Sequence, residues 1–143
     1  MKCVIQRVSE ASVTVDGSIV SAIKGGLLVL AGIERGDQEA DIRKAADKIL
    51  AMRIFADDQG KTNKSVRDVK GSILAVSQFT LAAAFKGGTR PSFDTAEKPE
   101  RAEALFNDMA AHLKSQEIEV KTGVFGASMR VSLVNDGPFT IVL

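Results

Sequence analysis

The chain has 143 residues, a length that suits one domain, and we expect residues 1–143 to form a single domain. Its 19 basic and 18 acidic residues give a net charge of +1, which excludes a protein held on nucleic acid by a broad basic surface, so that any RNA partner must be gripped locally. With one cysteine and one histidine, the sequence excludes an intrachain disulfide and a conventional zinc site.

The first part of the chain has the period-two hydrophobic pattern of strands. Residues 3–8 and 13–15 alternate between the two faces and lead to Asp16-Gly17, a dipeptide typical of a hairpin turn. We expect residues 19–23 to form the returning strand. The uninterrupted apolar run 27–31 then predicts a strand that is covered on both faces.

An amphipathic helix is expected next. Gly36-Asp37 marks its start, with Asp37 as the predicted N-cap. Its buried stripe is predicted from apolar residues at helical spacing, which end at Arg53: Ile42, Ala45, Ala46 and Ile49. A polar segment, residues 57–70, follows with a turn at 58–60, and residues 72–79 predict another apolar strand.

The second half contains an irregular segment, a second helix and further strands. Residues 82–98 hold Gly87-Gly88 and Pro91 and predict a loop with a possible function. Pro99 fits the first position of a helix. The predicted buried stripe of this helix consists of Ala102, Leu105, Phe106, Met109 and Leu113. Strands are expected at 118–121, 129–134 and 139–143, with Gly137-Pro138 separating the last two.

This order of elements contains few strictly alternating strand–helix units. It favours an α+β or mixed α/β fold, with a barrel-like, largely antiparallel β-sheet and two main helices packed on it. No apolar run reaches the ~20 residues needed to span a bilayer, and the first residues lack the pattern of a secretory signal. The expected location is therefore the cytoplasm.

Conventional nucleophilic catalysis finds little support in the sequence. Ser77 ends an apolar strand, but it lacks the G-x-S-x-G context, and the only histidine, His112, lies beside the buried stripe of a helix. Cys3 is interpreted as a small packed hydrophobe. Two basic groups could contact phosphate or belong to the solvated surface: Lys61, Lys64, Arg67 and Lys70, and Lys86, Arg90, Lys98 and Arg101.

Two segments carry polar residues or a proline at positions where the hydrophobic pattern would otherwise predict regular strands. Ser77-Gln78-Phe79-Thr80-Leu81 places polar side chains at the end of an apolar strand, and buried polar groups are costly unless they are bonded. Asn135-Asp136-Gly137-Pro138-Phe139-Thr140 sets a proline between two good strands, which marks a break, a bulge or an edge.

Together these two segments resemble the signature motifs of the D-aminoacyl-tRNA deacylase (D-tyrosyl-tRNA deacylase) family. Further segments are similar in the same order and spacing along the whole chain, among them Gln6-Arg7-Val8, Arg90-Pro91-Ser92-Phe93 and Thr122 to Ala127. A sister type of this family acts on L-alanine misattached to a threonine tRNA and carries a proline where this chain has Ser77. Ser77 and Phe79 therefore favour the D-specific type.

The resemblance implies a hydrolase that cleaves the ester of D-aminoacyl-tRNA to free D-amino acid and tRNA, a proofreading step in translation quality control. It implies rejection of L-aminoacyl-tRNA and leaves open whether mischarged glycyl-tRNA is also cleared. The partners it implies are the 3′-terminal adenosine of aminoacyl-tRNA and a second copy of the chain, in a homodimer with active sites at the interface. No cofactor, no metal and no membrane are implied.

The family's functional residues carry over onto matching positions of this chain. Catalytic roles are implied for Ser77, Gln78 and Thr80. Substrate-binding roles are implied for Phe79, Leu81, Phe125, Gly126, Ala127, Met129, Gly137 and Pro138. In the family, the Gly-Pro pair has a cis peptide bond, enters the partner's pocket and excludes L-amino acids. Hydrolysis relies on the terminal 2′-hydroxyl of the RNA more than on a protein nucleophile.

Two alternatives stay open on the sequence. One is a non-catalytic binder of tRNA 3′ ends or nucleotides on the same fold, which deacylation of a D-aminoacyl-tRNA would distinguish from the hydrolase. The other is a conventional Ser77 esterase, which full activity after His112→Ala would exclude.

Overall fold

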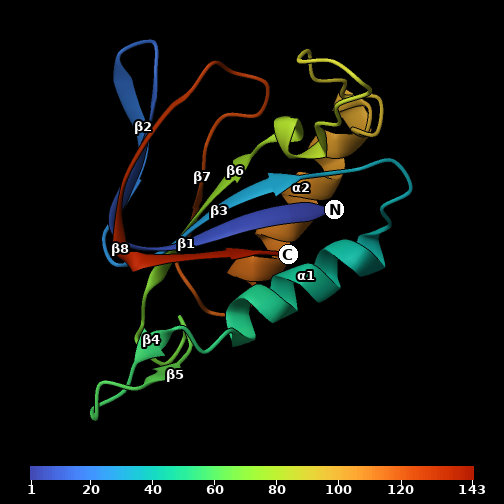
Figure 1. The fold of residues 1–143 in the computed structure, drawn as a ribbon. Helices are drawn as coiled ribbons and strands as arrows, with labels where there is room; N and C mark the ends of the chain where they lie inside the picture. The colour runs from blue at the N-terminus through green and yellow to red at the C-terminus, as the bar shows by residue number, and fades with distance from the viewer.

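The computed structural model describes all 143 residues and shows a mixed α+β fold, in which a curved, barrel-like sheet packs against two helices (Figure 1). The elements, in chain order, are β1 (Lys2–Val15), β2 (Ser18–Ile23), β3 (Gly26–Gly32), α1 (Glu39–Ala51), β4 (Phe55–Ala56), β5 (Thr62–Lys64), β6 (Ser72–Ser77), the 3-10 turn η1 (Phe79–Ala82), α2 (Pro99–Lys114), β7 (Val120–Thr122) and β8 (Arg130–Val142).

The long strand β1 organises the sheet because it pairs antiparallel with three others. Its first half, Lys2–Val8, pairs with β3, and its second half, from Ala11 to Val15, pairs with β2. Strand β8 runs along both halves. The sheet continues from β3 to β6 and β7 in parallel. Three antiparallel pairings against two parallel ones confirm the predicted sheet, which is curved, barrel-like and largely antiparallel.

Two apolar cores hold this arrangement. The larger contains 20 buried residues and lies between the sheet and the helices, where β3 contributes Leu27 and Val29, and α2 contributes Met109 and Leu113. The smaller contains seven, with Val13 among them, and fills the inside of the curved sheet. Strand β3 is buried along nearly its whole length, as its apolar run predicted.

Helix α2 begins at Pro99 as expected, but the predicted start of α1 is wrong by one position. The N-cap is Gln38, which forms a capping box with Asp41. Asp37 instead accepts a hydrogen bond from the Glu34 amide N–H at 2.7 Å, and so stabilises the turn before the helix. The helix ends at Ala51, before Arg53.

The C-terminal segment forms one strand where two were expected. Asn135 pairs with Val8 and Thr140 pairs with Gln6, so that residues 136–139 stand opposite the single residue Arg7. This bulge absorbs the Gly-Pro pair without ending β8, because β1 supplies ladder partners on both sides of it. The Gly137–Pro138 peptide bond is cis, as expected.

Candidate active site

A cavity of about 440 Å³ opens between the end of β6, the start of α2 and the segment that precedes β8. Its size falls within the range of small-molecule sites. The lining is mostly apolar and consists of Ile33, Val76, Ser77, Gln78, Phe79, Ala96, Glu97, Pro99, Ala102, Phe125, Gly126, Ala127, Met129 and Val131.

The first wall of the cavity is set by the end of the buried strand β6. Ser77 is the last residue that pairs with β3, opposite Ala31. The Gln78 amide N–H donates to the Ala31 carbonyl at 2.8 Å, after which the chain turns into η1. The regular parallel pairing of β3 and β6 therefore fixes where these polar residues emerge. The side-chain amide of Gln78 donates to Thr80 Oγ1.

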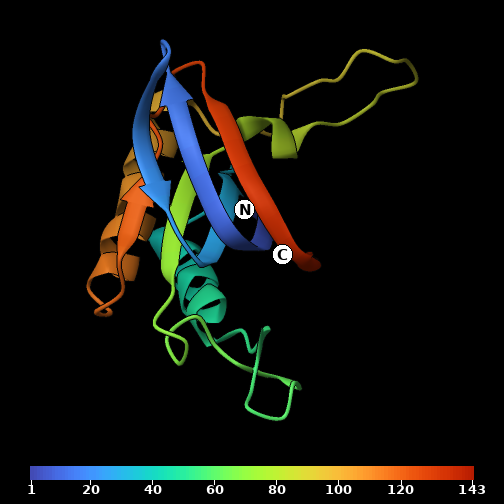
Figure 2. The same cartoon turned by 90° about the vertical axis from the view of Figure 1, so that its left-hand side faces the viewer.

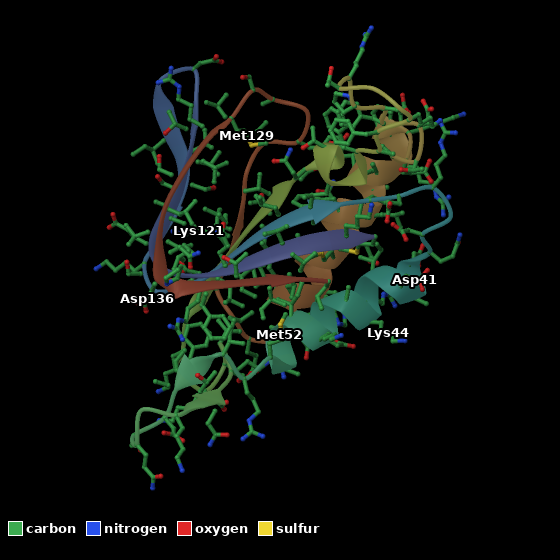
Figure 3. All side chains as sticks on the ribbon, in the orientation of Figure 1. Asp41, Lys44, Met52, Lys121, Met129 and Asp136 are labelled. Carbon is green, nitrogen blue, oxygen red and sulfur yellow. The ribbon has the colours of Figure 1, made fainter.

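The opposite wall is built by residues 125–131. The ring of Phe125 lies 6.3 Å from that of Phe106 on α2, which anchors this segment to the larger core. Gly123 makes room for Met129, because a Cβ at that position would lie 2.6 Å from the Met129 sulfur. Figure 3 shows Met129 at the upper end of the sheet, near the start of β8.

Seven of the residues singled out from the sequence line this cavity: Ser77, Gln78, Phe79, Phe125, Gly126, Ala127 and Met129. Thr80 is exposed beside it, and Leu81 lies against β3, where a Cβ at Gly32 would approach its Cβ to 3.0 Å. Gly137 and Pro138 are exposed and do not line it. Figure 3 shows the neighbouring Asp136 at the bend partway along β8, well away from Met129.

Arg7 lies beside Gly137 and Pro138, and no role for it was predicted from the sequence. Its Nε donates to the Asp136 carbonyl at 2.9 Å, and its Nη1 donates to the Ile54 carbonyl at 2.6 Å. Its guanidinium carbon lies 4.8 Å from the centre of the Phe139 ring, within cation–π distance. Only 17% of its side chain is exposed. Nothing local marks this arginine, because its partners lie far away in the sequence.

The segment 136–139 is also held by hydrogen bonds to the side chain of Asn135, which precedes it. The Asn135 side chain accepts a hydrogen bond from the Phe139 amide N–H and donates one to Thr140 Oγ1, both at 2.9 Å. Gly137 has a φ of 142°, and a Cβ there would lie 3.1 Å from Arg7 Nη2. Glycine therefore fits both the backbone conformation and the space beside the arginine.

The other candidate nucleophiles and bases lie outside the cavity. His112 Nε2 is 2.7 Å from Asp47 Oδ1 and links α2 to α1. Cys3 is 1% exposed, and burial raises the pKa of its thiol to about 11, which confirms its interpretation as a packed hydrophobe. The structure contains no group of three or more Cys, His, Asp or Glu side chains placed to hold a metal ion. None of its helices has the length and apolar character required to cross a bilayer.

Comparison with known proteins relates the whole chain to one family. The family model described as D-Tyr-tRNA(Tyr) deacylase matches residues 4–143. The D-aminoacyl-tRNA deacylase of Geobacter sulfurreducens is 55% identical over 143 residues, which cover 100% of this chain and 94% of that protein. The corresponding protein of Lactobacillus gasseri is 53% identical over 143 residues, covering 100% and 99%.

Two solved structures share the architecture. The c-Myc DNA Unwinding Element Binding Protein is 45% identical, with a TM-score of 0.95 over 100% of this chain and 97% of that one. A probable eukaryotic D-amino acid tRNA deacylase is 17% identical, with a TM-score of 0.83 over 99% of this chain and 97% of that one, and this likeness concerns the fold alone.

Proposed function

Because the chain belongs to the D-Tyr-tRNA(Tyr) deacylase family and is a D-aminoacyl-tRNA deacylase, a hydrolase, we propose that the cavity between Ser77 and Met129 is where it cleaves its ester. One observation carries this proposal: seven residues from two segments far apart in the chain, to which the family resemblance gives catalytic or substrate-binding roles, line one cavity. Its volume and apolar walls suit the adenosine and the amino-acid side chain.

The chemistry needs only modest help from the protein, since an aminoacyl ester is already activated. Water adds to the ester carbonyl carbon, the C–O bond to the ribose breaks, and the ribose oxygen takes a proton. Phe79 and Thr80 are the first two residues of the turn η1, so no carbonyl within the turn accepts a hydrogen bond from their amide N–H groups. We assign them to the negative charge that develops on the carbonyl oxygen, an effect that can lower a barrier by several kcal/mol.

The side chains around the cavity indicate which groups can assist the hydrolysis. Ser77 and Gln78 lie where they can orient the ester, whereas His112 is engaged with Asp47 and does not line the cavity. This arrangement favours assistance by the terminal 2′-hydroxyl of the RNA over a serine nucleophile with a histidine base. The reaction belongs to the cytoplasm, where charged tRNA is used.

Rejection of L-esters is assigned to Gly137 and Pro138 of a second copy of the chain. Both residues are exposed and lie away from the cavity of their own chain, which supports their acting on a neighbour. Held by Arg7 and Asn135, they would form a rigid wall at the α-carbon of the substrate. An L side chain would collide with this wall, while a D side chain would point away from it.

A symmetric dimer follows from this assignment. Strand β8 pairs only with β1, so that its other edge is free, and Val134 and Val142 on it are 50% and 71% exposed. Such an edge is normally covered in a native assembly. We expect light scattering at micromolar concentration to give twice the chain mass, and a monomer mass would contradict the proposed site.

The decisive experiment is a matched incubation with D-tyrosyl-tRNA, L-tyrosyl-tRNA and glycyl-tRNA. We expect rapid release of D-tyrosine and no release of L-tyrosine above the uncatalysed rate. Glycyl-tRNA should also be cleaved, because glycine has no side chain to meet the wall. Equal rates on the two tyrosyl enantiomers would refute the proposed wall. Binding of tRNA without cleavage of any ester would instead favour a non-catalytic binder of tRNA ends.

A further inference from the structure

A slender hairpin projects from the body of the molecule next to the cavity. We call residues 84–92 the arm. The backbones of Ala84 and Ser92 exchange two hydrogen bonds, of 2.9 and 2.8 Å, and close its base. All residues from 85 to 91 are exposed. Figure 2 shows this segment reaching away from the sheet, beyond η1.

The base of the arm is tied to the wall of the cavity. Thr95 Oγ1 donates to the Ala82 carbonyl at 3.0 Å, which joins the return of the arm to η1. Phe93, just after the arm, packs edge-on against Phe79, with the ring centres 5.1 Å apart. Because Phe79 lines the cavity, a ligand that leaves the cavity on this side meets the arm first.

The side chains of the arm combine one exposed aromatic ring with positive charge. Phe85 is 64% exposed. Arg90 forms no ion pair or side-chain hydrogen bond, and Lys86 is paired only with Asp94, an exposed partner. No acidic residue occurs between Phe85 and Pro91. A ring for stacking and cations for phosphates are what proteins use to hold unpaired nucleotides.

We propose that the arm binds the unpaired nucleotides that precede the terminal adenosine of the tRNA. Phe85 stacks on one of their bases, while Arg90, helped by Lys86, contacts the phosphates. This inference rests on the proposed function, since it takes the cavity as the place of the terminal adenosine. It also accounts for RNA binding by a chain whose net charge is only +1, because the grip is concentrated at one point.

The chemistry of the arm fits RNA better than a second copy of the chain. The buried centre of a subunit interface is mostly apolar, and lysine is depleted there, although arginine and aromatic residues are not. The tip of the arm has the sequence Lys86-Gly87-Gly88-Thr89-Arg90, which contains no large apolar side chain. Its single aromatic ring is therefore flanked by charge and flexible backbone.

The test compares two substrates that share the cavity but differ at the arm. These are D-tyrosyl-tRNA and the 3′ ester of D-tyrosine with adenosine alone. We expect Phe85→Ala and Arg90→Ala each to raise KM for the tRNA about 5- to 20-fold with kcat unchanged. Both variants should cleave the adenosine ester like the wild type. Phe85→Tyr, which keeps a ring for stacking, should restore the KM for the tRNA.

The dependence on salt distinguishes a phosphate contact from a structural role. Removing Arg90 should lower the slope of log KM against log salt concentration by about 0.7, the value for one phosphate contact on a single strand. The matched control is Lys44→Ala, which removes one positive charge from α1, far from the arm (Figure 3), and should leave KM and the slope unchanged.

Three results would overturn the proposal: an unchanged KM for the tRNA, an equal loss on both substrates, or a monomer mass for the arm variants, which would make the arm a subunit contact. Binding of uncharged tRNA, followed by fluorescence anisotropy, separates this inference from the proposed function. If the arm variants weaken the binding of uncharged tRNA while the wild-type protein cleaves no ester, the proposed role of the arm is supported and the proposed function is contradicted.

Discussion

Replacing Arg7 with alanine should lower kcat/KM for D-tyrosyl-tRNA about 100-fold, a loss of about 2.7 kcal/mol of transition-state stabilisation. The substitution removes both hydrogen bonds to the Asp136 and Ile54 carbonyls and the contact with the Phe139 ring. Hydrogen bonds to charged groups contribute about 1.5–3 kcal/mol each to stability, so the substitution removes most of what positions the segment 136–139. The segment 136–139 is then held only by the hydrogen bond from the Phe139 amide N–H to the Asn135 side chain.

Discrimination between enantiomers is the more informative measurement on this variant. If residues 136–139 form the wall against L-esters, a loosened wall should raise the rate on L-tyrosyl-tRNA relative to the D-ester. A merely structural arginine would lower both rates together. The variant should therefore be assayed on both enantiomers, with its unfolding by urea measured alongside.

Arg53→Ala is the matched control for this prediction. Arg53 is also an arginine whose Nε donates to a backbone carbonyl, that of Asn63, but it lies at the base of the exposed β4–β5 hairpin. We expect it to change kcat/KM less than twofold, as surface substitutions away from a site usually do. An Arg7→Ala protein that keeps wild-type activity and wild-type discrimination would remove Arg7 and the segment it holds from the site.

Replacing Gly26 with alanine should destabilise the protein by more than about 4 kcal/mol, enough that little folded protein accumulates. A Cβ at this position would lie 1.9 Å from the Ser72 carbonyl oxygen and 2.7 Å from its nitrogen. Both are backbone atoms of the paired strand β6, so that no side-chain movement can relieve the collision. The pairing of β3 with β6, which positions Ser77, would have to break.

Gly25→Ala provides the comparison at the adjacent residue. A Cβ there would have only the Val8 carbonyl oxygen within reach, at 4.0 Å. We expect the free energy of unfolding to change by less than about 1 kcal/mol, measured as the midpoint of urea denaturation. Equal midpoints for the two variants would show that β3 and β6 are not packed as closely as described.

The sequence predicted what depends on neighbours along the chain. Asp16-Gly17 located the hairpin between β1 and β2, because a two-residue turn carries its own signal. Pro99 located the start of α2. The N-cap of α1 was placed at Asp37 rather than Gln38 because aspartate is the better cap in isolation, whereas here its carboxylate is bonded to the Glu34 amide N–H.

Half of the residues that line the cavity could be singled out from the sequence, whereas the contacts between distant segments could not. The residues that were singled out and line one cavity are Ser77, Gln78, Phe79, Phe125, Gly126, Ala127 and Met129. The contacts of Arg7 could not be predicted from its neighbours in the sequence, because an arginine in an alternating strand is ordinary until the bulge opposite it is known. The continuity of β8 was missed for the same reason, since it depends on β1 rather than on residues near Pro138.

The contact between Arg7 and Asp136 joins residues that are 129 positions apart, and that between Gln6 and Thr140 spans 134. Contacts between residues so far apart in the sequence close the largest loops in the chain, and proteins dominated by such contacts fold slowly. An intermediate with its hairpin and helices in place would still lack the pairing of β1 with β8. If residues 136–139 form the proposed wall, chiral selectivity is acquired late in folding, and discrimination against L-esters, more than secondary structure, reports that the molecule is complete.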